Sequence, residues 1–96
     1  MSYAPKIVLK LPMANPDALS PFVEACLSDR VELIAVVGPD CENVHDLIDH
    51  AIIGDGSDNS RFIVTSWHSD EPFDDVLEFA REWTAKTEGQ VQVVSL

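Results

Sequence analysis

Residues 31–45 read Val-Glu-Leu-Ile-Ala-Val-Val-Gly-Pro-Asp-Cys-Glu-Asn-Val-His and decide the fold. A strand that helices cover on both faces is apolar throughout, and the first seven residues of this stretch are apolar except for Glu32. Pro39 cannot continue a strand because it lacks the N–H of the ladder. Asp40 is expected to accept the free backbone N–H of Asn43 and so to begin a helix. The stretch predicts the corner between a strand and a helix in a parallel sheet.

The rest of the chain alternates apolar runs with amphipathic segments. Strands are expected at residues 6–11, 31–37, 61–67 and 91–95, and helices from Pro21, from Asp40 to Gly54, and from Ser69 or Asp70 to Gly89. Gln90 and Gln92 alternate with valines in the last run, which is typical of an edge strand. The 96 residues form one domain, residues 1–96. The order β-α-β-α-β-α-β predicts a three-layer, Rossmann-like α/β fold with a four-stranded, mainly parallel sheet.

The order of the strands in this sheet follows from chain connectivity. Right-handed crossovers and the edge character of the last strand favour the order 2-1-3-4, a flavodoxin-like half sheet. In that order the first helix alone covers one face. A helix of about ten residues is ~15 Å long and cannot cover four strands that span about as much again. We therefore expect apolar sheet surface to remain exposed. We also expect two copies of the chain to pair as a homodimer, through that face or through the last edge strand.

The charge balance limits the possible partners. Seventeen acidic side chains against six basic ones give a formal net charge of −11. A nucleic acid would approach against this field, and no cluster of Lys and Arg is present to displace its counterions, so we expect no nucleic-acid binding. The acidic side chains either keep the surface solvated or serve recognition. In the second case they bind a basic protein partner or mimic a nucleic-acid surface.

Nothing in the chain predicts export or membrane insertion. No apolar run approaches the ~20 residues that a membrane span needs, so we expect no membrane contact. The amino-terminal residues, Met-Ser-Tyr-Ala-Pro-Lys, lack the apolar stretch of a secretory signal. Cys26 and Cys41 fall in different predicted helices, as expected of free thiols in a reducing cytosol, and Cys26 lies on an inner stripe. We expect a cytoplasmic protein with Cys26 in its core.

Three short runs carry a resemblance to a known family. They are Val-Val-Gly-Pro-Asp-Cys-Glu at 36–42, Gly-Asp-Gly-Ser-Asp at 54–58 and Arg-Phe-Ile-Val-Thr-Ser-Trp-His at 61–68. Over residues 33–83 the chain resembles a small bacterial α/β family of uncharacterised function. The resemblance implies a bacterial source and a self-standing domain, and it assigns no catalytic residue.

The predicted strand order places a crevice between the carboxyl ends of the first and third strands, where ligands of such sheets bind. The candidate ligand-binding residues around it are Met13, Asn15, Trp67, His68, Ser69 and Asp70, with Asp40 and Cys41 across the first strand. Trp67 either caps the core at the end of its strand or forms a wall of a pocket or partner surface.

Cys41 is the candidate nucleophile of this crevice. A thiol in the first turn of a helix feels the positive end of the helix dipole, and His68 could act as its base. Asp40 and Glu42 flank the thiol, however, and their negative charge disfavours the thiolate. No motif supplies an oxyanion donor or an orienting carboxylate, so no catalytic residue is assigned.

Possible metal ligands occur four residues apart on the second predicted helix, as His45 with Asp49 and as Asp46 with His50. Such spacing arises by chance in an Asp-rich helix, and both histidines lie off its apolar stripe. We expect no metal. No cofactor is expected either, because the glycine patterns that close on phosphate are absent from the sequence.

The sequence does not identify a biochemical activity. It favours a small acidic binding or regulatory module that acts through protein contacts over an enzyme, because no catalytic signature is complete. The acidic charge and the uncovered sheet both indicate partners. The alternative is a small-molecule ligand site or an enzymatic site at the carboxyl edge of the sheet, formed by Cys41, Trp67 and His68.

Overall fold

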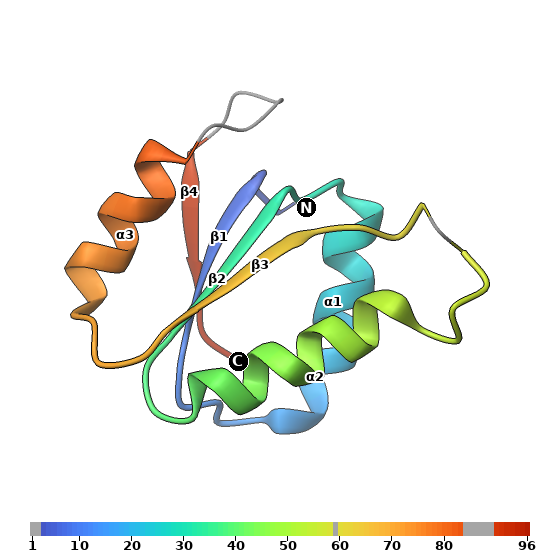
Figure 1. Cartoon of the computed structure of the whole chain (residues 1–96), viewed down its shortest axis with the longest axis horizontal. Coiled ribbons are helices and arrows are strands. Elements are labelled where there is room, and N and C mark those ends of the chain that lie inside the picture. Colours follow the sequence, from blue (N-terminus) through green and yellow to red (C-terminus); the bar gives the residue numbers. More distant parts are fainter. Residues whose placement is uncertain (1–2, 59, 84–89) are drawn as a thin grey trace.

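The computed structural model describes residues 3–58, 60–83 and 90–96 (Figure 1). Its elements are β1 (Lys6–Lys10), the short 3-10 helix η1 (Pro16–Ala18), α1 (Leu19–Ser28), β2 (Leu33–Val37), α2 (Cys41–Ile53), β3 (Val64–His68), α3 (Phe73–Glu82) and β4 (Val91–Val94). All neighbouring strands pair in parallel. The predicted α/β fold with four strands and three main helices is confirmed.

The strand order is β3-β2-β1-β4, and it differs from the predicted 2-1-3-4 because β3 is an edge strand. The central strands β1 and β2 are buried along nearly their whole length. Phe62 and Ile63, which suggested a buried third strand, precede β3, and the strand itself contains Thr65, Ser66 and His68. This polar composition fits an edge. The other edge is β4, as predicted, so the sheet has the order of a Rossmann-type half and not of a flavodoxin-like one.

Helices α1 and α2 pack together on one face of the sheet, and α3 alone covers the other (Figure 1). The single covering helix is thus α3 and not the first helix, because the connection from β3 to β4 passes back over the two central strands. The core on the α1 and α2 side includes Ile7, Leu9, Phe22, Val23, Cys26, Ile34, Val36, Val44 and Ile48. The smaller core under α3 contains Val8, Leu33, Ala35, Val37, Val76 and Ala80. The predicted burial of Cys26 is confirmed.

The helix boundaries differ from prediction mainly at prolines. Helix α1 begins at Leu19, two residues before the predicted start at Pro21, and η1 begins at Pro16. Pro21 is tolerated because amide groups of the first turn have no helical partner. Helix α3 is preceded directly by Pro72, so neither of the predicted capping residues begins it. Its predicted end at Gly89 lies outside the described residues.

The carboxyl ends of β2 and β3 lie side by side, since the two strands stay in register up to Val37 and His68. The chain then leaves β2 toward α2 on one face of the sheet and leaves β3 toward α3 on the other (Figure 1). Connections that leave adjacent strands toward opposite faces open a crevice at the strand ends. This divergence determines where the candidate site lies.

Candidate functional site

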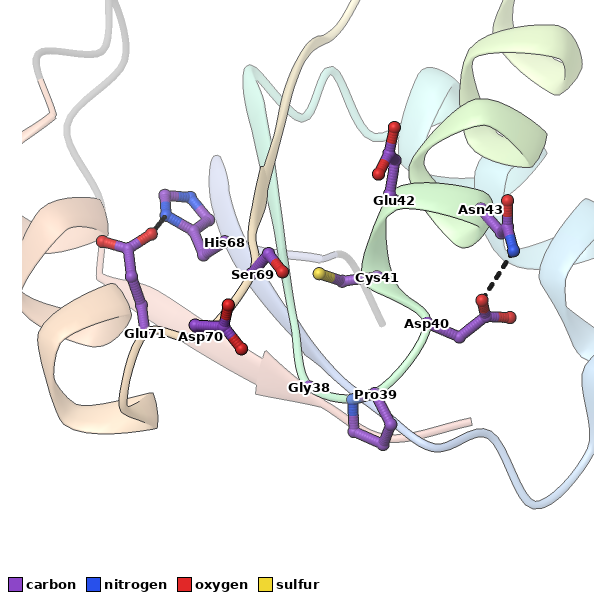
Figure 2. A pocket seen from close by; sticks show the side chains of 10 residues that line it. All are labelled: Gly38, Pro39, Asp40, Cys41, Glu42, Asn43, His68, Ser69, Asp70 and Glu71. Carbon is purple, nitrogen blue, oxygen red and sulfur yellow. Dashed lines mark hydrogen bonds and ion pairs between the residues drawn. The ribbon is translucent and has the colours of Figure 1, made fainter.

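A cleft of about 500 Å³ lies between the β2–α2 and β3–α3 connections. It is lined by Gly38, Pro39, Asp40, Cys41, Glu42, Asn43, His68, Ser69, Asp70 and Glu71 (Figure 2). Its residues come from the amino-terminal turn of α2 on one side and from the end of β3 on the other. The cleft therefore occupies the crevice that the strand connections open.

The structure brings five of the eight predicted site residues into this cleft, namely Asp40, Cys41, His68, Ser69 and Asp70. The other three lie elsewhere, Met13 and Asn15 because β1 is not adjacent to β3, and Trp67 because of the face of β3 to which it points. Met13 packs against the core on the α1 and α2 side, and Asn15 donates its backbone N–H to the carbonyl of Leu96. Trp67 points to the opposite face of β3 from His68, and its ring lies 6.4 Å from that of His45.

Sequence reasoning missed five lining residues, namely Gly38, Pro39, Glu42, Asn43 and Glu71. Each one directly follows or lies close to a residue that was assigned to the crevice. The signal that could have found them is the length of the two connections. Both are short, so the first turn of the following helix, or the residues just before it, must reach the strand end.

The β2–α2 connection is pressed against the end of β1. Gly38 has a φ of 114°, and a Cβ at this position would lie 2.8 Å from the carbonyl oxygen of Leu11. Leu11 in turn donates its backbone N–H to Val37 at 2.9 Å. Glycine is therefore required here both by the left-handed backbone and by the close approach. One wall of the cleft is thereby fixed to the centre of the sheet.

Asp40 does not cap α2 in the predicted way. Its backbone is left-handed, with a φ of 66°, and no side chain caps the first turn of the helix. The Asp40 carboxylate instead accepts a hydrogen bond from the side-chain amide of Asn43 at 2.6 Å. The prediction that it accepts the backbone N–H of Asn43 is wrong, because the left-handed conformation turns the carboxylate toward the exposed side of the helix (Figure 2).

His68 is held by hydrogen bonds at both ring nitrogens. Its Nδ1 lies 2.7 Å from Glu71 Oε2, and its Nε2 lies 2.9 Å from Ser66 Oγ. The ring also packs on Phe79, with centroids 4.8 Å apart. No hydrogen bond joins His68 to Cys41 among the described residues, so the nucleophile–base pair considered above is not assembled.

The line Ser66–His68–Glu71 has the connectivity of a nucleophile, a base and an orienting acid. Ser66, however, is not among the residues that line the cleft. A reacting carbonyl in the cleft would therefore have no contact with this hydroxyl. We interpret the three side chains as the hydrogen-bonded support of the β3–α3 connection.

The carboxyl edge of the sheet is strongly acidic. The connections after β1, β2 and β3, with the first turns of α2 and α3, carry Asp17, Asp40, Glu42, Asp70, Glu71, Asp74 and Asp75. Of the described residues, Lys10 is the one cation at this edge, and its Nζ lies 4.9 Å above the ring of Phe73. Neither Lys nor Arg lines the cleft, whereas four carboxylates do.

The two thiols occupy different environments. Cys26 is fully buried, and desolvation together with the charge of Asp29 raises the pKa of its thiol to about 12. Cys41 is 4% exposed, and its sulfur points into the cleft (Figure 2). Cys41 is thus the thiol that a ligand in the cleft would contact.

The described residues contain no group of three or more His, Cys, Asp and Glu side chains placed to hold a metal ion. His45 and Asp49 do approach each other, with Nε2 and Oδ2 3.5 Å apart. Both are engaged by Thr65, whose hydroxyl donates to Asp49 Oδ1 at 2.6 Å and lies 3.0 Å from His45 Nε2. Through Thr65, the His45 and Asp49 side chains connect α2 to β3.

Comparison with known families places the chain. The family described as "Domain of unknown function (DUF7684)" matches residues 7–96. The chain belongs to the DUF7684 family. The predicted membership of a family of uncharacterised function is confirmed, and the DUF7684 match extends over parts of all four strands instead of residues 33–83 alone. No curated protein matches this DUF7684 chain, and no solved structure does. Within its described part, none of the helices is long and apolar enough to cross a membrane.

Proposed function

We propose that this DUF7684 domain is a binding module whose acidic carboxyl edge receives a positively charged segment of a partner protein. The observation that carries the proposal is the cleft, which four acidic residues from two connections line without a Lys or Arg among its lining residues. The surrounding edge is acidic as well. A basic partner is therefore the chemistry that complements this surface.

Coulomb energies support a cation as occupant. A cation 4 Å from one carboxylate gains roughly 1 kcal/mol in water and roughly 4 kcal/mol where the effective dielectric constant is near 20. The attractions of several carboxylates around one cleft add to each other. A guanidinium group can also bind a carboxylate through two parallel hydrogen bonds, which gives Arg an advantage over Lys.

The size and setting of the cleft fit a side chain of the partner. Its volume of about 500 Å³ lies within the range of small-ligand sites. Asp40 and Asp70 both have left-handed backbones, with φ of 66° and 63°, which fixes the two connections in uncommon conformations. Non-glycine residues of this kind gather at ligand-binding sites, where the surrounding structure maintains the strain.

The experiment is a calorimetric titration with an Arg- and Lys-rich octapeptide at about 0.15 M salt. The Asp70→Asn/Glu42→Gln variant removes two cleft carboxylates, and Asp55→Asn/Asp58→Asn removes two at the opposite edge, so both have a net charge of −9, from −11 plus two. We expect the first variant to bind at least about tenfold more weakly and the second within about twofold of the parent. Equal losses would show that bulk charge alone attracts the peptide and would reject the cleft.

A cationic small molecule is the second candidate occupant, favoured by the Cys41 sulfur that faces the cleft. A ligand of this class would meet the same carboxylates and would lie against the thiol. Titration with spermidine distinguishes a cationic small molecule from a basic partner protein. Spermidine that binds as tightly as the octapeptide would favour the small molecule, as would rapid alkylation of Cys41 by iodoacetamide in the protein without ligand.

We further propose that the domain works in the bacterial cytoplasm and as a homodimer. The cytoplasm is supported by two free thiols. Self-association is supported by the sheet face that α3 covers alone, next to which Val93 on edge strand β4 is 44% exposed. Apolar surface at an unpaired edge is a common site of pairing between copies.

A further inference from the structure

The outer side of β3 is an unprotected strand edge. In a parallel ladder, successive residues direct their N–H and C=O groups alternately to the two sides. Val64 donates its N–H to Glu32 at 3.0 Å, so Val64 faces β2, whereas Thr65 and Trp67 direct their backbone groups outward. Proteins usually protect such edges with Lys, Pro or a bulge. Residues 64–68 contain no Lys or Pro and stay in continuous register with β2.

Exposed aromatic side chains flank this edge on both faces of the sheet. On the α2 side, Trp67 is 42% exposed. On the α3 side, Phe79 is 39% exposed and packs on His68. Phe62, two residues before β3, is 73% exposed. Aromatic residues of this kind dominate the binding energy of protein interfaces, because they bury a large area at low entropic cost.

The charges beside the edge are negative. Asp46 and Asp49 lie on α2 with side chains 65% and 42% exposed, and Asp49 is held toward β3 by the hydroxyl of Thr65. The cation that precedes the strand, Arg61, is bound to the carboxylate of Glu24. A chain that approaches the edge from solvent therefore meets carboxylates on the α2 side.

We propose that β3 accepts an extended basic segment of a partner protein as a fifth strand of the sheet. Its backbone pairs with the outward groups of Thr65 and Trp67, as in other cases of strand addition. Because side chains of a strand alternate, its cations lie on the α2 side, over the Trp67 ring and beside Asp46. Its apolar side chains lie on the α3 side against Phe79.

The proposal rests on the proposed function, since both require a basic partner, and it adds the backbone geometry of recognition. The edge and the cleft are continuous, because β3 ends at His68 and the cleft begins there. One segment can therefore pair with β3 and place its last cation between the cleft carboxylates.

The probe is an acetylated heptapeptide amide of alternating Lys and Val, and the measurements are its Kd and the hydrogen exchange of individual protein amides. Pairing with an added strand removes the outward N–H groups from water. We expect the exchange of the Thr65 and Trp67 amides to slow at least about tenfold in the complex. The Val64 amide, which is already bonded to β2, serves as the internal control.

A second peptide isolates the backbone contribution. It has the same sequence with alternate peptide nitrogens methylated on the pairing side, which keeps its charge and removes its ladder hydrogen bonds. Two lost hydrogen bonds of about 1 kcal/mol each predict a Kd at least about tenfold higher. Asp46→Asn should raise the Kd of the unmodified peptide about twofold to fivefold, whereas Asp55→Asn in the α2–β3 loop should not change it.

The outcomes separate the two proposals. If the methylated peptide binds as well as the parent and Asp70→Asn/Glu42→Gln weakens both, strand addition is rejected and the acidic cleft stands. If neither peptide binds, both are rejected. If the Thr65 and Trp67 amides are already protected in the free protein, in proportion to its concentration, a second copy occupies the edge and the proposal is overturned.

Discussion

Arg61 holds the α2–β3 loop to helix α1 through a two-pronged pair with Glu24. Its Nη1 and Nη2 lie 3.0 and 2.6 Å from the two carboxylate oxygens. The same guanidinium donates to the backbone carbonyls of Ile52 and Ala51 at 2.7 and 2.8 Å. The Arg61 side chain thus holds together the end of α2, the α2–β3 loop and the middle of α1.

The first prediction concerns the pH dependence of stability. The hydrogen bond and charge of Arg61 lower the pKa of Glu24, so this carboxylate stabilises the fold above the ordinary pKa of Glu. The contribution is lost as the pH falls through the lowered value. We expect Glu24→Gln to unfold more easily at neutral pH and to lose less stability than the parent between about pH 5 and pH 3. Urea unfolding at both ends of this range measures the difference, and parallel pH profiles would contradict it.

The second prediction concerns Lys6, whose buried side chain binds backbone carbonyls at the carboxyl end of α3. Its Nζ donates to the carbonyls of Arg81 and Trp83 at 3.0 and 3.1 Å. Lys6→Met keeps the length of the side chain and leaves both carbonyls without this donor. We expect a loss of about 1–3 kcal/mol in the free energy of unfolding. Lys10→Met is the control and should cost less than about 1 kcal/mol, because that cation is exposed above Phe73.

The third prediction concerns Gly38, at which the β2–α2 connection packs directly against the residue after β1. Gly38→Ala places a methyl group 2.8 Å from the carbonyl of Leu11 and forces a left-handed backbone on alanine. We expect it to destabilise the fold by about 2–4 kcal/mol. Gly56→Ala also has a positive φ, of 81°, but nothing lies within 4 Å of its Cβ position, so about 1 kcal/mol is expected. Equal losses of stability in the two variants would show that the close approach does not matter.

The fourth prediction concerns the two thiols. Cys26 has a pKa raised to about 12 and remains a protonated, buried thiol at pH 8. Iodoacetamide should therefore modify Cys41 first, and an occupied cleft should slow that reaction. Peptide mapping after partial labelling gives the ratio of the two products. Labelling of Cys26 at the rate of Cys41 in the folded protein would refute the assignment.

The fifth prediction concerns self-association. Burial of apolar surface contributes roughly 25 cal/mol per Å² and does not depend on screening, whereas repulsion between two acidic copies is screened over about 8 Å at physiological salt. We expect a dimer that becomes tighter as salt is raised to ~0.5 M. Sedimentation equilibrium at high concentration tests this. A mass that stays at 10.6 kDa would rule the dimer out.

The sequence predicts those parts of the fold in which local pattern and tertiary environment agree. The apolar runs of β1 and β2 identify central strands, and Gly54 marks the end of α2. The strand order was wrong because Phe62 and Ile63 are apolar yet precede β3, and composition alone does not show where the ladder begins. That error moved Met13 and Asn15 into a crevice that they do not reach.

The site was predictable to the extent that it depends on chain proximity. Asp40 and Cys41 follow β2, and His68 ends β3, so all three lie at the carboxyl edge of a parallel sheet in any strand order. The predicted order left β1 between them, and the observed adjacency of β2 and β3 brings them into one cleft. The left-handed backbone of Asp40 was not predictable, because Asp is a common capping residue in its usual extended conformation. Trp67 lies outside the cleft because neighbouring side chains of a strand point to opposite faces.

The separation of charge along the strands gives the molecule an electric dipole moment. Lys6, Arg30, Arg61 and Arg81 lie at the amino edge of the sheet, where they offset the charge of acids such as Asp29, Asp55 and Asp58, whereas Lys10 is the one cation at the acidic carboxyl edge among the described residues. The domain therefore experiences a torque in the field of a basic body before any contact forms. A collision is biased toward the orientation in which the cleft and the end of β3 lead, so a larger share of encounters becomes productive at low salt.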